Sequence, residues 1–208
     1  MTENDTAILY YSDLRGHWPD ERAARFQRAL AYGKRLATDA QEIEGRQTLA
    51  GVSLARRALS AMLGREVAAR EFVFPEGGKP HVPGAADFSI AHSGSWVGCA
   101  IVGAGRVGFD VEVLREGVEK AVRVLAGEEL TPELALARWV ATEAALKAHG
   151  ASVREALDVS FLEGRAFFRG EPLFRVDVDV FEGAAACVMT SQPVPGVETR
   201  FVALEELF

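Results

Sequence analysis

Residues 107–113, Val-Gly-Phe-Asp-Val-Glu-Val, constrain the fold more than any other stretch of the sequence. Apolar residues alternate there with Gly108, Asp110 and Glu112, which is the pattern of a strand with one face in a core. Both carboxylates then point from the same face about 7 Å apart, and their repulsion is roughly 2 kcal/mol at an effective dielectric constant of about 20. Water offsets such a repulsion on an exposed face, and a divalent cation offsets it in a cleft.

A long helix is predicted downstream of this strand. Thr131 suits its N-cap, Pro132 its first position and Gly150 the position just beyond its end. Glu143 and Lys147 lie four residues apart and therefore share one face of the helix. An ordinary surface ion pair has the same order of charges and contributes only about 0.3 to 0.5 kcal/mol.

The overall composition is that of an ordinary globular protein, and no apolar segment approaches the length of a membrane span. Its 208 residues are 49% hydrophobic and 25% charged, enough for one domain or two small ones. The net charge of −7 argues against a nucleic-acid surface. The first residues lack a basic region followed by an apolar run, so we expect a cytoplasmic location. Cys99 and Cys187 lie in apolar runs, which predicts reduced core thiols.

The remaining elements follow from periodicity and turn residues. Further helices are predicted from residue 19, at 47–63 and at 116–126. Further strands are predicted at 7–11, 71–74, 88–91, 96–102, 159–162, 166–168, 173–181, 184–190 and 200–204. The strands at 88–91, 96–102 and 107–113 are joined by short connections, so we expect them to form an antiparallel meander.

Helices followed by strands occur twice along the chain, which predicts an α+β fold of two similar α/β halves with antiparallel sheets. The boundary is expected near residues 103–105, giving halves at 1–104 and 105–208. The first half is electrically neutral, and the whole net negative charge falls on the second. Two halves fused in one chain favour a monomer.

A cleft between these halves would bring separate charged groups together. It would be lined by Lys79 and His92 from the first half and by Asp110, Glu112, Glu143 and Lys147 from the second. Lys79 follows two glycines on a tight turn, and His92 lies at a strand end where it can face a ligand. A histidine there is more often a simple surface group. Asp177 and Asp179 alternate with valines, and we interpret them as a solvated face and not as metal ligands.

Four short stretches in the central third of the chain form an ordered set. They are 78–80 (Gly-Lys-Pro), 88–93 (Phe-Ser-Ile-Ala-His-Ser), 108–112 (Gly-Phe-Asp-Val-Glu) and 139–147 (Trp-Val-Ala-Thr-Glu-Ala-Ala-Leu-Lys). In order and spacing the set resembles the motifs of 4′-phosphopantetheinyl transferases, in particular the longer, monomeric type that activates peptide and polyketide synthetases. Each motif is weak alone, and the four together are specific. The resemblance implies the pseudo-duplicated fold of that family.

The resemblance also implies a metal site. Asp110, Glu112 and Glu143 would coordinate Mg²⁺, which binds few carboxylates and keeps waters for phosphate oxygens. Lys147 would lie near the pyrophosphate of coenzyme A. From the chemistry of the reaction we assign general-base work on the serine to Glu143, directly or through a metal-bound water, and stabilisation of the leaving group to Lys147.

The same resemblance assigns three residues to the nucleotide end of coenzyme A. Lys79 and His92 would contact the 3′-phosphate, and Arg46 is a weaker candidate. Two positions depart from the family pattern: Thr142 replaces a common basic residue, and Ala91 replaces a common serine. Each departure removes one phosphate contact and leaves the metal ligands in place.

The implied reaction transfers 4′-phosphopantetheine from coenzyme A to a serine of an apo acyl or peptidyl carrier protein and releases 3′,5′-ADP, an activity of the holo-acyl-carrier-protein synthase type. Two alternatives stay open. The same three carboxylates suit a Mg²⁺-dependent pyrophosphohydrolase acting on coenzyme A-like substrates. A non-catalytic module that binds carrier proteins is the other.

Overall fold

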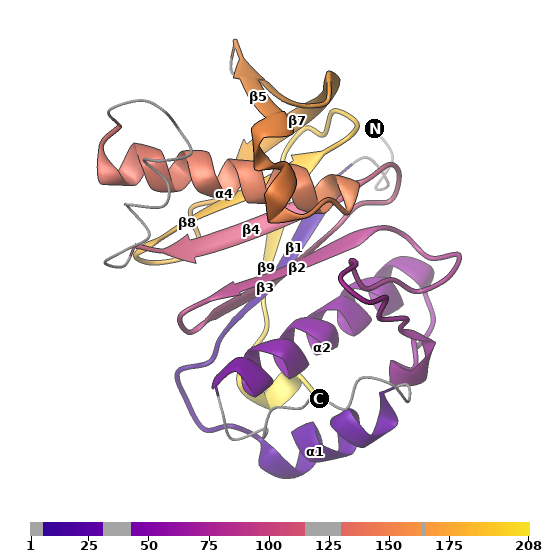
Figure 1. The fold of residues 1–208 in the computed structure, drawn as a ribbon. Helices are drawn as coiled ribbons and strands as arrows, with labels where there is room; N and C mark the ends of the chain where they lie inside the picture. Colours follow the sequence, from indigo (N-terminus) through magenta and orange to yellow (C-terminus); the bar gives the residue numbers. More distant parts are fainter. Residues whose placement is uncertain (1–5, 31–42, 115–129, 164) are drawn as a thin grey trace.

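The computed structural model describes residues 6–30, 43–114, 130–163 and 165–208 (Figure 1). The helices are α1 (Asp20–Ala29), α2 (Ile43–Leu63) and α4 (Pro132–His149), with short 3-10 helices η2 (Ala69–Glu71), η3 (Val153–Asp158) and η4 (Leu204–Glu206). The strands are β1 (Ala7–Asp13), β2 (Phe88–Ser93), β3 (Trp96–Ile101), β4 (Val107–Val113), β5 (Val159–Leu162), β6 (Arg165–Phe168), β7 (Glu171–Asp177), β8 (Ala184–Thr190) and β9 (Val197–Phe201). The architecture is mixed α and β, as expected, with mainly antiparallel sheets.

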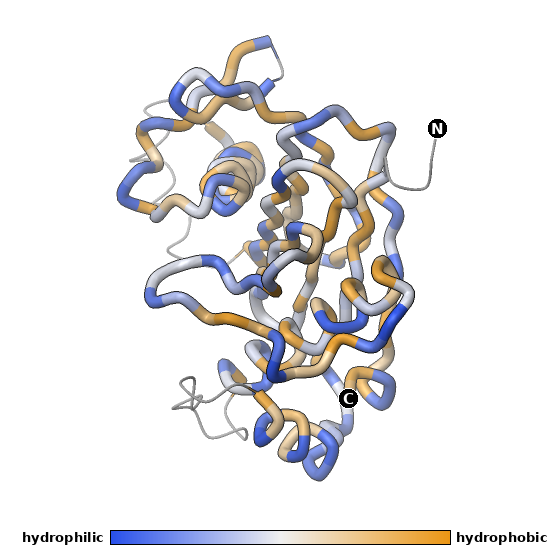
Figure 2. The backbone as a smooth tube through the Cα atoms, turned by 90° about the vertical axis from the view of Figure 1, so that its right-hand side faces the viewer, coloured by the Kyte–Doolittle hydropathy of each residue, from blue (hydrophilic) through white to orange (hydrophobic). Residues whose placement is uncertain are grey.

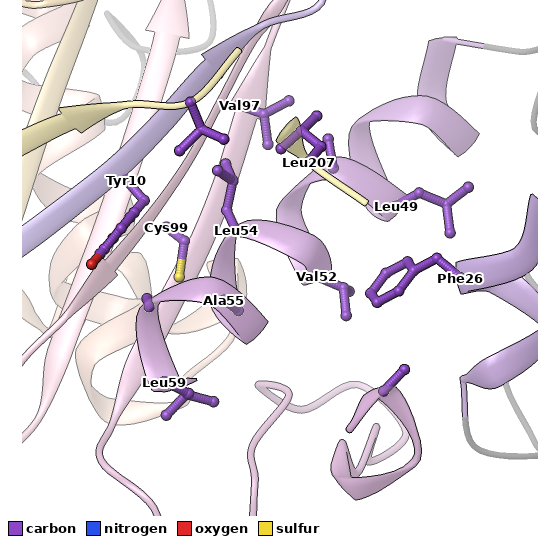
Figure 3. Packing of buried hydrophobic residues seen from close by; sticks show 14 of the residues in the cluster. Tyr10, Phe26, Leu49, Val52, Leu54, Ala55, Leu59, Val97, Cys99 and Leu207 are labelled. Carbon is purple, nitrogen blue, oxygen red and sulfur yellow. The ribbon is translucent and has the colours of Figure 1, made fainter. Parts of the chain in front are cut away.

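The first sheet has the strand order β2-β3-β1-β9, in which β1 is antiparallel to β3 and parallel to β9. Helix α2 covers one face of this sheet, and the core between them includes Leu54, Val97 and Cys99 (Figure 3). Gly51 allows the close approach, since a Cβ there would lie 2.5 Å from a methyl carbon of Ile90. Hydrophobic residues recur along these central strands (Figure 2).

The second sheet has the order β4-β8-β7-β6-β5, and every pairing in it is antiparallel. Helix α4 lies across β4 and β8 on the face away from the first sheet (Figure 1). Its N-cap Thr131 accepts a hydrogen bond from the Leu134 N–H, and Gly150 ends it with a left-handed φ of 65°. A Cβ at Gly108 of β4 would lie only 1.8 Å from the carbonyl oxygen of Ala144, so helix and strand touch at this glycine.

Strand β4 runs beside β2 of the first sheet, where side chains take the place of a strand pairing. The Oγ of Ser89 accepts a hydrogen bond from the N–H of Phe109 at 3.0 Å, and the Oγ of Ser93 accepts one from the N–H of Val113 at 3.1 Å. Phe109 belongs to an apolar cluster that fills the space between the two sheets. We call this contact line between β2 and β4 the seam.

The predicted three-strand meander is wrong in its third strand. β2 and β3 form the expected hairpin, but β4 pairs with β8 in the other sheet. The physical reason is that β3 has only two edges, and these pair with β2 and β1, so β4 cannot join them. The N–H groups of Phe109 and Val113 on the outer edge of β4 donate instead to serine side chains of β2.

Other predicted elements were displaced or fall outside the described residues. The predicted strand at 71–74 is wrong: after η2 it contributes a single bridge between Val73 and His81, while Phe72 is buried. β7 ends at Asp177, before the predicted limit of 181. The last strand, β9, begins at Val197, before the predicted 200–204, and overlaps the predicted range only at residues 200–201. The helix predicted at 116–126 lies outside the described residues.

The final strand brings together segments that lie far apart in the sequence. β9 pairs with β1 in the first sheet, and Val202, Leu204 and Leu207 pack into the core beneath α2. The predicted halves at 1–104 and 105–208 and their duplication stay a prediction. Among the helices of the described segments, none is long and apolar enough to cross a membrane.

The close packing at Gly108 generates the first prediction. Gly108→Ala would insert a methyl group into the backbone of α4 and should lower the free energy of unfolding by roughly 3 kcal/mol. Gly196→Ala is the matched control, because a Cβ there meets nothing within 4 Å and the change should stay within about 0.5 kcal/mol. Thermal and denaturant unfolding measure both, and equal stability of the two variants would contradict the packing argument.

Candidate active site

A pocket of about 250 Å³ opens between α2, β2, β4 and α4, next to the seam. Its lining residues are Thr48, Val52, Phe74, Pro80, Ile90, Ala91, His92, Asp110, Glu112, Glu143 and Lys147. The structure therefore brings together five of the predicted site residues. Asp110 and Glu112 come from β4, Glu143 and Lys147 from α4, and His92 from β2.

Asp110 is the most buried acid in the pocket, at 4% exposed. Its Oδ1 accepts a hydrogen bond from Lys147 Nζ at 2.6 Å, whereas its Oδ2 is buried and has no hydrogen-bond partner. Burial raises the pKa of Asp110 to about 7, Lys147 opposes that rise, and the charges of Glu143 and Glu112 add to it. The site therefore holds more negative charge than Lys147 alone balances.

The other two carboxylates are half-buried at the pocket wall. Glu112 accepts a hydrogen bond from Ser93 Oγ at 2.6 Å, across the seam. Glu143 lies on the turn of α4 that touches Gly108, so the tight helix contact sets its distance from β4. An acid from a packed helix thus faces the same pocket as two acids from a strand.

The donor set is suitable for Mg²⁺, although the carboxylates are not grouped as a ready-made ligand cage. Carboxylate oxygens are the ligands that Mg²⁺ prefers, and the buried, unpartnered Oδ2 of Asp110 is one. Within the described residues, no three His, Cys, Asp or Glu side chains meet the spacing of a metal site. Two of the three carboxylates are instead held by protein donors, Lys147 and Ser93.

His92 is exposed at the end of β2 and lines the pocket, as the sequence suggested for a ligand-facing residue. Desolvation lowers the pKa of His92, and the positive charge of Lys147 lowers it further, while Glu112 opposes both. The imidazole is therefore neutral at pH 7 and can donate a hydrogen bond without adding charge.

Lys79 lies outside the pocket lining and makes a structural contact. Its Nζ donates to both oxygens of Asp87, at 2.8 and 2.7 Å, and to the carbonyl of Val107 at 2.7 Å. Burial lowers the pKa of Lys79 more than Asp87 raises it. Since Asp87 Oδ2 also accepts from the N–H of Val107, Lys79 reinforces the seam at its other end.

Arg46 also lies outside the pocket lining. Its guanidinium carbon is 5.5 Å from the centre of the Trp18 ring, and its Nε is buried without a hydrogen-bond partner. The predicted roles of Lys79 and Arg46 at the nucleotide end of coenzyme A stay predictions.

Sequence reasoning missed the role of Ser93 and the apolar part of the pocket wall. Ser89 and Ser93 are four residues apart on β2 and both fall on its buried face, which is a usable signal that their hydroxyls have partners. Val52, Phe74 and Ile90 carry no such signal, because apolar residues in helices and strands are ordinarily core residues. Asp177 is exposed and paired with Arg175, which agrees with the predicted solvated face.

Two comparisons with known proteins bear on this mixed α/β chain with its acidic pocket. No protein-family model matches the chain. A 4′-phosphopantetheinyl transferase of Bacillus subtilis is 37% identical to it over 76 residues, which are 36% of the chain and 34% of that protein. The match thus spans about a third of the length of that relative. It supports a relationship to 4′-phosphopantetheinyl transferases.

The burial of Asp110 predicts a pH-dependent stability. Its pKa is raised in the folded state from 3.8 to about 7, so its destabilising effect is absent below pH 4 and complete above pH 7. Asp110→Asn should therefore gain stability over the unaltered protein as the pH rises through this window, by on the order of 2 to 4 kcal/mol. The measurement is thermal unfolding between pH 4 and 8 with divalent metal removed.

The matched control for this titration is Asp179→Asn, because Asp179 is exposed. Its unfolding temperature should follow that of the unaltered protein at every pH. A difference between Asp110→Asn and the unaltered protein that stays constant from pH 4 to 8 would show that Asp110 is not destabilised by its charge.

Proposed function

We propose that this protein transfers 4′-phosphopantetheine from coenzyme A to a serine of an apo acyl or peptidyl carrier protein and releases 3′,5′-ADP. The observation that carries the proposal is the convergence of Asp110, Glu112, Glu143 and Lys147 on one pocket from a strand and a helix. The partial match to a 4′-phosphopantetheinyl transferase supports it. The proposal includes the longer, monomeric type, a cytoplasmic location and the holo-acyl-carrier-protein synthase class of activity.

The three carboxylates are the groups of this pocket that suit a hard divalent cation. In the proposal Asp110, Glu112 and Glu143 hold Mg²⁺, which when bound would neutralise charge on the pyrophosphate oxygens. Asp110 and Glu112 are suited to this because β4 is fixed between β8 and the seam. A rigid base lowers the reorganisation needed when a ligand binds.

Lys147 is placed to bind developing negative charge. Its Nζ lies 2.6 Å from Asp110 Oδ1, and its side chain is 30% exposed, so the ammonium is at the boundary between the buried acid and the open pocket. In the proposal it orients the pyrophosphate and stabilises the departing 3′,5′-ADP. His92 lines the same pocket from β2 and would donate a hydrogen bond to a phosphate.

Glu143 is the proposed general base for the carrier serine. It is half-buried, lines the pocket and can accept the hydroxyl proton directly or through a water. The serine oxygen attacks the β-phosphorus of coenzyme A as the bond to the 3′,5′-ADP oxygen breaks. Positioning and charge neutralisation supply most of the rate increase in such reactions.

Intact-mass spectrometry of apo-carrier proteins incubated with the protein, coenzyme A and Mg²⁺ tests the proposal. A phosphopantetheine adduct is expected, and Asp110→Ala or Glu143→Gln should lower its rate by roughly 10²-fold or more. Glu133→Gln is the control, because Glu133 is exposed in the first turn of the same helix. Turnover by Asp110→Ala or Glu143→Gln at the rate of the control would refute the assignment.

Incubation with coenzyme A alone separates the alternatives. A pyrophosphohydrolase would release 3′,5′-ADP without any carrier protein, whereas the proposed transferase requires one. A binding module would retain a carrier without increasing its mass.

A further inference from the structure

Two serines on β2 have almost the same surroundings and differ in one contact. Ser89 and Ser93 are 1% and 2% exposed, and each accepts a hydrogen bond from a backbone N–H of β4. Ser93 alone also donates its hydroxyl proton to Glu112 Oε2, at 2.6 Å. The Ser93 hydroxyl therefore accepts from the backbone of Val113 in the seam and donates to the side chain of Glu112 in the pocket.

The chemistry of a hydroxyl group explains why this arrangement fixes a carboxylate. A serine hydroxyl has one proton to donate and lone pairs to accept with. The N–H of Val113 donates to a lone pair of the Ser93 oxygen, and the single hydroxyl proton of Ser93 is directed toward Glu112. Hydrogen bonds to a charged acceptor are short and strong, and 2.6 Å is in the range of an O–H donor on a carboxylate.

We propose that Ser93 is a positioning residue that holds the Glu112 carboxylate in the orientation needed for binding a divalent cation. This inference rests on the proposed function, in which Glu112 is a metal ligand. A free glutamate samples several rotamers, and ordering it when a ligand binds has an entropic penalty. Ser93 removes part of that penalty before the cation arrives, as donors to metal-ligating carboxylates generally do.

Ser93 also couples the pocket to the first sheet. Glu112 and its backbone belong to β4 of the second sheet, whereas the hydroxyl that orients it comes from β2 of the first. A shift of one sheet along the seam would therefore move Ser93 relative to Glu112. The geometry of the carboxylate thus depends on contacts from both sheets.

The test measures binding of Mn²⁺, a spectroscopic substitute for Mg²⁺, by electron paramagnetic resonance without coenzyme A or carrier. Ser93→Ala should weaken Mn²⁺ binding by about 10- to 100-fold. Ser89→Ala removes the matching seam contact and should change the affinity by less than about threefold. Both variants should lose thermal stability, because each loses a hydrogen bond to a backbone N–H of β4, and Ser93→Ala should lose at least as much as Ser89→Ala, because it also loses the bond to Glu112.

A double-mutant cycle with Glu112 tests whether Ser93 affects Mn²⁺ affinity through the Glu112 carboxylate. In a Glu112→Ala background, Ser93→Ala should have no further effect on Mn²⁺ affinity, because its acceptor is gone. Equal Mn²⁺ affinities of Ser93→Ala and Ser89→Ala, additive effects in the cycle, or no Mn²⁺ binding by the unaltered protein would each overturn the inference. Mn²⁺ binding without modification of any carrier would refute only the proposed function and would still test Ser93.

Discussion

The close contact of α4 with β4 is the constraint on which both the fold and the pocket depend. Because Gly108 has no side chain, the backbone of α4 at Ala144 rests directly on the strand. This contact places Glu143 and Lys147 opposite Asp110, which lies two residues beyond the glycine. The geometry of the acidic pocket is thus a consequence of backbone packing, and the charged side chains are added to a frame that is already close-packed.

The second constraint is that the outer edge of β4 is not paired with any strand of the described residues. Exposed strand edges promote unwanted pairing with other chains, and proteins ordinarily cover them. Here Asp87, Ser89 and Ser93 accept hydrogen bonds from alternate N–H groups of β4. The same contacts hold two separate sheets together and leave the pocket at one end of their junction. Protection of the edge and construction of the site therefore use the same side chains.

Local patterns predicted single elements well and their assembly less well. The alternation around Asp110 and the caps Thr131 and Gly150 identified β4 and α4, because strand and helix periods are properties of the local sequence. The grouping of Asp110 with Glu143 was predicted from two expected halves that enclose a cleft, and the family resemblance implied it as well. The prediction placed β4 in the wrong sheet. A short connection indicates that β3 and β4 are near each other, but it does not show whether the second edge of β3 is free to pair. The ion pair of Lys79 with Asp87 was not predicted. The two residues are close in sequence, but no helix or strand period places them on a common face.

The parallel pairing of β1 with β9 has a consequence for how the chain acquires its structure. Tyr10 lies beside Arg200, so the first sheet gains its fourth strand only when residues 197–201 are present. Pairing of segments so far apart in sequence is slow, because a long loop must close before any contact forms. A chain emerging from a ribosome would carry an incomplete first sheet until these residues have been synthesised, and this edge of β1 would lack its native strand partner in the meantime.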